Sequence, residues 1–159
     1  MLHFACKTFD ELSSRELYEI MTLRLEVFAV EQQCVYQDAD GLDPDCRHLM
    51  GRDEDGTLLA YTRLLPPGLA YPGYASIGRV VTAPDARNKG LGRPLMQTSI
   101  DWVNQLWQEP PIKIGAQFYL RKFYASLGFE STGEIYLEDL ILHLKMVRYP
   151  KNNDHFSRF

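Results

Sequence analysis

The sequence lacks a long apolar run, and this limits the cellular compartments in which we expect the protein. No stretch approaches the ~18 consecutive apolar residues that a membrane-spanning helix needs. Residues 1–14, MLHFACKTFDELSS, hold no basic segment followed by an apolar core, so the sequence predicts no secretory leader. We therefore expect a cytoplasmic protein without a membrane partner.

Cysteines are few, and their number and spacing argue against cross-links. Cys6, Cys34 and Cys46 are an odd set in a chain long enough to bury a core, which favours reduced thiols over disulfides. No C-x-x-C pair begins a metal site. Asp38 and Asp40 resemble the start of a calcium loop, but the glycine and glutamate that such a loop needs farther on are missing. We predict no metal.

Neither sign of charge dominates the chain. There are 17 Lys and Arg against 21 Asp and Glu, with a net charge of −4. This balance gives a nucleic-acid partner no electrostatic support and mildly favours a cationic small substrate. The 159 residues are 45% hydrophobic and 24% charged, as in soluble globular proteins. We expect a single domain over residues 1–150 and a polar tail over residues 151–159.

Periodicity and turn signals predict strands mixed with helices. The predicted strands are residues 2–9, 48–52, 57–65, 75–82, 112–116, 131–136 and 141–147. The second and third flank the turn DEDG and should form an antiparallel hairpin. The predicted helices are residues 13–30, 91–107 and 119–127, the last closed by Gly128. The first helix has Ser13 and Glu16 at capping-box spacing and one apolar stripe: Leu17, Met21, Leu25 and Phe28.

The stretch 79–96, RVVTAPDARNKGLGRPLM, joins a β-branched run to a helical pattern through two closely spaced glycines. A loop entering a helix N-terminus presents unpaired N–H groups at the positive end of the helix dipole, and such a place binds anions. Gly90 and Gly92 remove Cβ atoms that would keep a ligand from those amides. Three cations stand nearby: Arg87, Lys89 and Arg93. We therefore predict a phosphate-binding loop.

Three kinds of phosphate loop compete for this stretch. A dinucleotide-binding fingerprint needs a third glycine where Leu95 stands, and a P-loop ends in Gly-Lys-Ser/Thr instead of Gly-Arg-Pro. The pattern that matches is Arg-x-x-Gly-x-Gly, formed by Arg87, Gly90 and Gly92. It resembles the acetyl-coenzyme A signature of the GCN5-related N-acetyltransferases (GNAT). By itself, the hexapeptide is also compatible with a surface turn that binds nothing.

A second segment extends the resemblance. In IKIGAQFYLRKFYASLGFE a β-branched strand leads to a short helix carrying Phe123 and Tyr124, similar to the family's second cofactor segment. Four further stretches, RLEVFAVEQQCVYQDADGLD, HLMG, IGRVV and YLEDLILHLKM, resemble the ElaA-like branch, so the likeness covers nearly the whole chain. That branch usually reads Glu-Asp-Gly-Ile-Pro-His where this chain has leucines at 140 and 142. The turn there should be more strand-like, which affects the shape of the substrate pocket.

The resemblance implies both a fold and a reaction. The fold is mixed α/β: a twisted, mostly antiparallel sheet with a splayed parallel pair (residues 75–82 and 112–116) and helices on both faces. The reaction is direct acetyl transfer from acetyl-CoA to a primary amine of a small molecule, with no covalent intermediate. A homodimer is one option. Two alternatives stay open: a non-catalytic acyl-CoA-binding or regulatory domain, and an acetyltransferase that acts on a protein amine.

The resemblance also assigns the cofactor residues and an acid. Those expected to bind acetyl-CoA are Val80, Val81, Thr82, Arg87, Asn88, Lys89, Gly90, Leu91, Gly92, Arg93, Gln117, Tyr119, Phe123 and Tyr124. Tyr124 is the expected acid, because a phenol with an ordinary pKa near ~10 is protonated at neutral pH and can share its proton with a thiolate. The alternative is a half-buried aromatic with a wet hydroxyl. A backbone N–H near Val81 is the expected donor to the thioester carbonyl.

The base that deprotonates the amine is less determined. Four side chains are candidates, acting directly or through water: Glu31, His48, Glu138 and His143. Each also has a structural explanation, such as a helix end or a hydrogen bond within a strand. Arg79, Glu31 and Glu138 are the expected substrate-binding residues. Arg79 suits a substrate carboxylate, although an ordinary ion pair explains it equally well.

Overall fold

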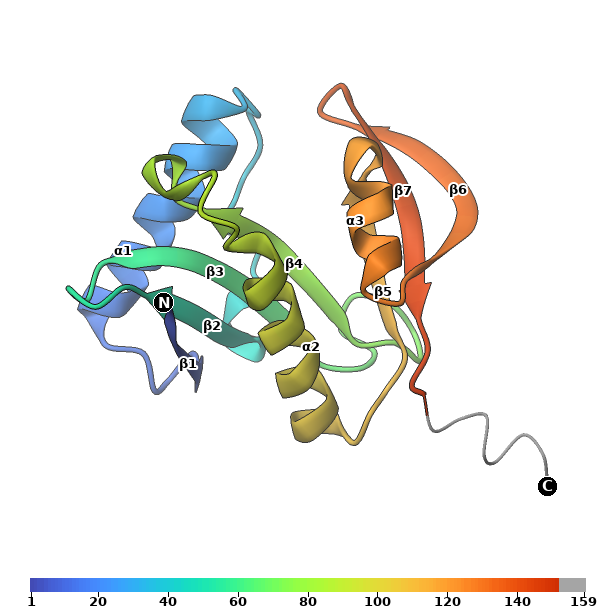
Figure 1. The fold of residues 1–159 in the computed structure, drawn as a ribbon, viewed down its shortest axis with the longest axis horizontal. Coiled ribbons are helices and arrows are strands. Elements are labelled where there is room, and N and C mark those ends of the chain that lie inside the picture. Colours follow the sequence, from blue (N-terminus) through green and yellow to red (C-terminus); the bar gives the residue numbers. More distant parts are fainter. Residues whose placement is uncertain (152–159) are drawn as a thin grey trace. The chain divides into compact units, whose positions relative to one another are not determined.

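A computed structural model describes residues 1–151 (Figure 1). These residues form two compact units, and each is described by itself. One consists of Met1–Leu65 and Ile77–Trp102, and the other of Pro66–Ser76 with the chain from Val103 onward. Apart from Lys151, the predicted tail lies outside the described residues. Among the described helices, none combines the length and apolarity of a membrane span.

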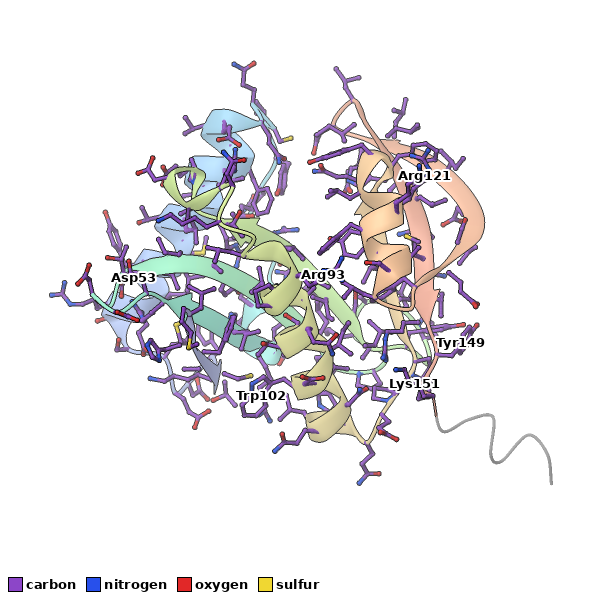
Figure 2. The ribbon with its side chains drawn as sticks, in the orientation of Figure 1. Asp53, Arg93, Trp102, Arg121, Tyr149 and Lys151 are labelled. Atoms are coloured by element: carbon purple, nitrogen blue, oxygen red, sulfur yellow. The ribbon has the colours of Figure 1, made fainter. Side chains whose placement is uncertain are left out.

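The first unit is built on a four-stranded sheet. Its strands lie in the order β1 (His3–Thr8), β2 (Arg47–Arg52), β3 (Leu58–Leu65) and β4 (Ser76–Thr82). The hairpin predicted around DEDG is confirmed, since β2 and β3 pair antiparallel. Asp53, which is labelled in Figure 2, stabilises the turn by accepting hydrogen bonds from the backbone N–H groups of Asp55 and Thr57, at 2.9 Å each. An aspartate that bonds to the backbone a few residues on stabilises such a turn.

Helices cover both faces of this sheet, as expected. Because side chains alternate along a strand, neighbouring residues enter two different cores. Met50 and Tyr61 belong to the core that includes α1 (Ser14–Leu25), whereas Leu49 and Ala60 belong to the core that includes α2 (Gly92–Trp107). Figure 2 shows Trp102 on α2, where it packs against the second core. Fully burying a large apolar side chain contributes about 1.5–3 kcal/mol.

The first helix begins where the sequence predicts. Ser13 Oγ accepts from the Glu16 N–H at 3.0 Å and Glu16 Oε1 accepts from the Ser13 N–H at 2.9 Å, which confirms the capping box. Beyond Leu25 the chain continues as one π-helical segment (η1, Glu26–Glu31), in which the Gln32 N–H donates to the Val27 carbonyl at 2.9 Å.

The predicted apolar stripe on this helix is wrong at Leu25. That side chain is 43% exposed, and the residues buried in the core are Ile20, Leu23 and Val27. The buried face of the helix includes Arg24, which is fully buried, and therefore lies one position away from the predicted stripe. A count of apolar residues alone cannot include an arginine.

The second unit is built on a three-stranded antiparallel sheet. Its order is β5 (Ile112–Gln117), β7 (Ile141–Arg148) and β6 (Glu130–Glu138). The helix α3 (Arg121–Ser126) follows a 3-10 turn (η4, Phe118–Leu120) and lies over the sheet (Figure 1). Gly128 closes it as predicted, at φ +96° with its N–H donating to the Ala125 carbonyl at 3.0 Å.

Two further features of this unit answer the sequence expectations. The expected parallel pairing is a single bridge between Ala75 and Ile112, and β4 and β5 lie in different sheets. The turn joining β6 to β7 consists of Asp139 and Leu140, both with positive φ (50° and 65°). The strands are paired up to Glu138 and Ile141, so the turn is as short as a hairpin loop allows.

Candidate active site

The loop between β4 and α2 has the open backbone of an anion-binding loop. A 3-10 turn (η3, Pro84–Ala86) is followed by two left-handed residues, Asn88 at φ +70° and Gly90 at φ +69°. Asn and Gly are the residues that adopt this region most readily. A Cβ added to Gly90 would meet no atom within 4 Å, so the space beside this backbone is open. The geometry fits a phosphate ligand.

The helix that follows supplies the positive end of a dipole. α2 begins at Gly92, and the first N–H groups of a helix have no partner within it. Arg93 lies in the first turn, as Figure 2 shows, and Pro94 follows it, where its missing N–H costs nothing. Arg87, Lys89 and the loop backbone of residues 88–91 directly precede this turn in the chain.

Two predicted site residues, Arg87 and Glu31, meet at the rim of this loop. Arg87 Nη2 lies 2.6 Å from Glu31 Oε1, and both side chains are about two-fifths exposed, at 42% and 38%. The pair connects the end of η1 to the loop. Glu31 therefore carries an ion pair in this structure, which reduces its value as a base.

A buried ion network holds the acidic segment that follows the first helix. Three arginines from three elements, Arg24 (α1), Arg63 (β3) and Arg79 (β4), contact three aspartates of that segment: Asp38, Asp40 and Asp43. We call these six residues the Arg–Asp network. Its charges balance, which buried ions need if their desolvation is to be compensated.

Hydrogen bonds within the network favour the ionised form of two of its carboxylates, those of Asp40 and Asp43. Burial by itself raises the pKa of Asp40, but two hydrogen bonds from Arg63, both 2.9 Å, together with the Leu42 N–H lower it to about 2. The pKa of Asp43 is likewise lowered: burial opposes ionisation, and Arg24 at 2.8 Å outweighs it. These aspartates are structural anions, not proton carriers.

Arg79 belongs to this network. Its Nε lies 2.9 Å from Asp38 Oδ1 and its Nη2 3.3 Å from Asp40 Oδ2, and its guanidinium lies over the Tyr36 ring. The structure thus shows the ion pair that the sequence left as an alternative to a substrate carboxylate. The side chain of Arg79 is 19% exposed.

His48 is enclosed and doubly hydrogen-bonded. It is fully buried, with Nε2 3.0 Å from the Asp43 carbonyl and Nδ1 2.7 Å from the Tyr61 hydroxyl. A carbonyl only accepts, so Nε2 carries the proton and Nδ1 accepts from Tyr61. Burial lowers the pKa of His48. Neither nitrogen has an open lone pair for an amine proton, which favours the structural explanation of this residue.

In the second unit, Tyr124 lies in α3 against two aromatic rings. Its ring packs edge-on against Phe123 and Phe129, with centroids 5.2 and 5.8 Å away, and the residue is 6% exposed. Burial, with a smaller contribution from Tyr119, raises the pKa of Tyr124 to about 12. Its hydroxyl is therefore protonated at neutral pH, the form that can donate a proton, and it is a weaker acid than an ordinary phenol.

His143 has one nitrogen fixed and the other open. Its Nδ1 lies 2.8 Å from the Ile141 carbonyl, so it carries the proton and leaves Nε2 with a lone pair. Nε2 lies 3.8 Å from Glu138 Oε2, and the carboxylate side chain is 63% exposed. The imidazole stacks on Tyr136. In the β5–β7 ladder Gln117 is the residue opposite His143, so three predicted site residues lie near one another: Gln117, Glu138 and His143.

Comparison with known proteins identifies the family. The model of the acetyltransferase (GNAT) domain matches residues 18–149. The chain belongs to the GNAT family of acetyltransferases. An acyl-CoA N-acyltransferase structure from Pseudomonas aeruginosa is 44% identical, with a TM-score of 0.87 over 93% of this chain and 99% of that one.

Two more relatives place this GNAT protein in the ElaA-like branch. The structure of Escherichia coli ElaA is 37% identical, with a TM-score of 0.85 over 93% of this chain and 99% of that one. A UPF0039 protein of Synechocystis sp. is 39% identical over 95% of this chain and 98% of its own length. The GNAT fold predicted from the sequence is thus confirmed, and its family is one of acyltransferases that bind acyl-CoA.

The sequence motifs described above do not predict the Arg–Asp network of this GNAT protein. They single out Asp38 and Asp40 only as the start of a calcium loop and give no role to Asp43, Arg24 or Arg63. A signal was available: Arg24 stands among apolar helix residues and Arg63 within the run LLAYTRLL. A buried arginine needs a carboxylate partner, and the nearby segment supplies three.

Proposed function

We propose that this protein is an acetyl-CoA-dependent N-acetyltransferase that transfers the acetyl group directly to a primary amine of a small molecule. The observation that carries this proposal is the loop of residues 87–92, with two left-handed residues and open space at Gly90, leading into α2. Its backbone N–H groups and the dipole of α2 suit the diphosphate of coenzyme A. Membership in the GNAT family supports the same ligand.

The proposed chemistry needs one acid, one base and one carbonyl donor. The amine nitrogen bonds to the acetyl carbon while the carbon–sulfur bond breaks. Tyr124, which is protonated at neutral pH, gives its proton to the leaving thiolate. A backbone N–H near Val81 donates to the thioester carbonyl as negative charge develops on its oxygen.

We assign His143 as the base and Glu138 as the residue that attracts the ammonium form of the substrate. Glu31 is paired with Arg87, and both nitrogens of His48 are hydrogen-bonded. His143 keeps a lone pair on Nε2, and the carboxylate near it is largely exposed to solvent. That carboxylate also stabilises the imidazolium that forms when Nε2 takes the amine proton.

Thiol release tests this function. The purified protein is mixed with acetyl-CoA and a panel of small primary amines, and free thiol is measured against the same mixture without amine. Turnover that depends on an amine is the expected result. If coenzyme A binds in calorimetry but no amine raises thiol release, the chain is an acyl-CoA-binding module. If a protein amine is acetylated and no small amine is, the acceptor class is wrong.

A further inference from the structure

Arg79 has an unusual backbone for a residue inside a strand. It lies in the middle of β4, sequence SIGRVVT, at φ +47°. A residue with a side chain is disfavoured in this left-handed region by about five- to thirtyfold in population, because its Cβ crowds the following carbonyl oxygen. Such a conformation persists where the surrounding structure holds it. Contacts of the Arg79 side chain are therefore expected to hold this backbone conformation.

Asp38 holds Arg79 through two hydrogen bonds. Arg79 Nε donates to Asp38 Oδ1 at 2.9 Å, and Arg79 Nη2 donates to the Asp38 carbonyl at 3.1 Å. Arg24 grips Asp38 in the same way from α1, through Nε to Oδ2 at 2.9 Å and Nη2 to the carbonyl at 3.0 Å. Asp38 is thus fixed between two guanidinium groups, with its side chain 4% exposed.

Two further contacts reinforce the orientation of the Arg79 side chain. The Tyr36 ring lies 5.3 Å from its guanidinium carbon, and Asp40 Oδ2 lies 3.3 Å from Nη2. Asp40 is in turn held by two hydrogen bonds from Arg63. Moving Arg79 to an extended backbone would redirect its side chain away from all of these partners. The contacts therefore stabilise the left-handed backbone of Arg79 through its side chain.

The residues after Arg79 are those expected to contact the thioester. Val80 and Val81 send their side chains into the two cores on opposite faces of the sheet. An irregular residue in a strand interrupts the ladder and re-aims the neighbouring N–H groups. An N–H released in this way is free to donate to a ligand.

We propose that Arg79 and Asp38 are positioning residues for the backbone N–H near Val81 that polarises the thioester carbonyl. The acidic segment of the Arg–Asp network thereby sets the shape of β4 from outside the strand. This inference rests on the proposed function. In this proposal Arg79 does not bind the substrate. Its guanidinium fixes the backbone angle of residue 79, and that angle orients the N–H near Val81.

Three substitutions at one position separate these roles. Glycine and asparagine both tolerate the left-handed region, whereas alanine favours an extended strand. We expect Arg79→Ala to lower kcat by about twentyfold or more, and Arg79→Gly and Arg79→Asn to stay within about fivefold of the natural protein. The KM for acetyl-CoA should change less than kcat in Arg79→Ala. If all three variants lose activity equally, the guanidinium itself acts on the substrate and the proposal fails.

A binding measurement gives a second readout that needs no acceptor amine. The N–H near Val81 can contact acetyl-CoA through the carbonyl but has no such partner in coenzyme A. Calorimetry of Arg79→Ala should therefore show a reduced preference for acetyl-CoA over coenzyme A, with the affinity for coenzyme A changed by less than about twofold. An unchanged preference overturns the proposal. If the natural protein binds neither nucleotide, the proposed function itself is wrong.

The control is Arg52→Ala, which removes another two-point arginine pair of the same unit, to Glu19 at 3.0 and 3.2 Å. It should leave both readouts unchanged. Thermal unfolding of every variant identifies those that fold. If Arg79→Ala does not fold, Asp38→Asn replaces it in both measurements. Asp38→Asn weakens the hydrogen bonds to Arg79, so kcat and the preference for acetyl-CoA should both decrease. An Asp38→Asn variant that retains both would contradict the proposal.

Discussion

Arg87 Nη2 lies 2.6 Å from Glu31 Oε1, and this ion pair joins the end of the first helical segment to the loop before α2. The sequence predicts different roles for the two residues: cofactor binding for Arg87 and deprotonation of the amine for Glu31. Their pairing indicates that Glu31 supports the rim of the loop. A substitution at Gly90, where the loop backbone is open, should therefore affect ligand binding more directly than one at Glu31.

Gly90→Ala should weaken coenzyme A binding by about tenfold or more. The new Cβ enters the space beside the loop and strains a backbone at φ +69°. Gly56→Ala is the matched control, because Gly56 also has a positive φ (+84°) and open space around it but lies in the β2–β3 turn. Calorimetry measures both. Equal affinities for the two variants would show that the loop does not bind the diphosphate.

Tyr124→Phe should reduce amine-dependent thiol release at least about tenfold, because the acid is removed while the ring is kept. The affinity for coenzyme A should change by less than about twofold. Tyr18→Phe is the control, since Tyr18 is 76% exposed on α1. A Tyr124→Phe enzyme with normal kcat would show that the hydroxyl is only the polar end of a packed ring.

His143→Asn should lower kcat at neutral pH by at least about tenfold, because asparagine keeps a donor for the Ile141 carbonyl but has no basic nitrogen. His3→Asn, at an exposed histidine of β1, is the control and should keep the natural kcat. An unchanged kcat in His143→Asn would exclude the residue as the base.

The Arg–Asp network should make stability depend on acid pH. The pKa of Asp40 is about 2 in the folded protein, below its ordinary value of 3.8, so the folded state favours the ionised carboxylate. The stabilisation is present above about pH 5 and is lost as the pH falls toward 2. Urea unfolding at several pH values should show this decrease.

Asp40→Asn should lower the free energy of unfolding at pH 7 by about 1–3 kcal/mol and flatten its decrease between pH 5 and 2. The control is Asp55→Asn, at an exposed aspartate of the β2–β3 turn, which should keep the natural slope. A slope in Asp40→Asn as steep as in the natural protein would assign the acid sensitivity to other groups.

Local signals were sufficient for much of the fold and for the backbone of the loop before α2. The Ser13–Glu16 cap, the hairpin at Asp53 and the helix end at Gly128 are each determined by residues within a few positions of one another. The left-handed loop at Gly90 is local in the same sense, since it needs glycine or asparagine at given positions. Such features can be recognised in a sequence because their physical causes are short-range.

The parts that the sequence did not predict depend on partners far along the chain. Arg24 has the spacing of a core residue but the chemistry of a surface one, and only the position of Asp38 and Asp43 explains its burial. The shift of the first helix's buried face away from Leu25 follows from the same arginine. Likewise, His48 and His143 look alike as isolated histidines in strands, and only their hydrogen-bond partners distinguish them.

The separation between Arg79 and Asp38 also has a consequence for how the chain assembles. The two residues are 41 positions apart, so the segment carrying the aspartates leaves the ribosome well before the strand that organises it. Contacts of such long separation form late, because the entropy of closing the intervening chain is lost before the contact stabilises anything. Until β4 joins the sheet, the acidic segment should be held in the nascent chain only by Arg24 and Arg63, which should make it more open to proteolytic attack than in the complete fold.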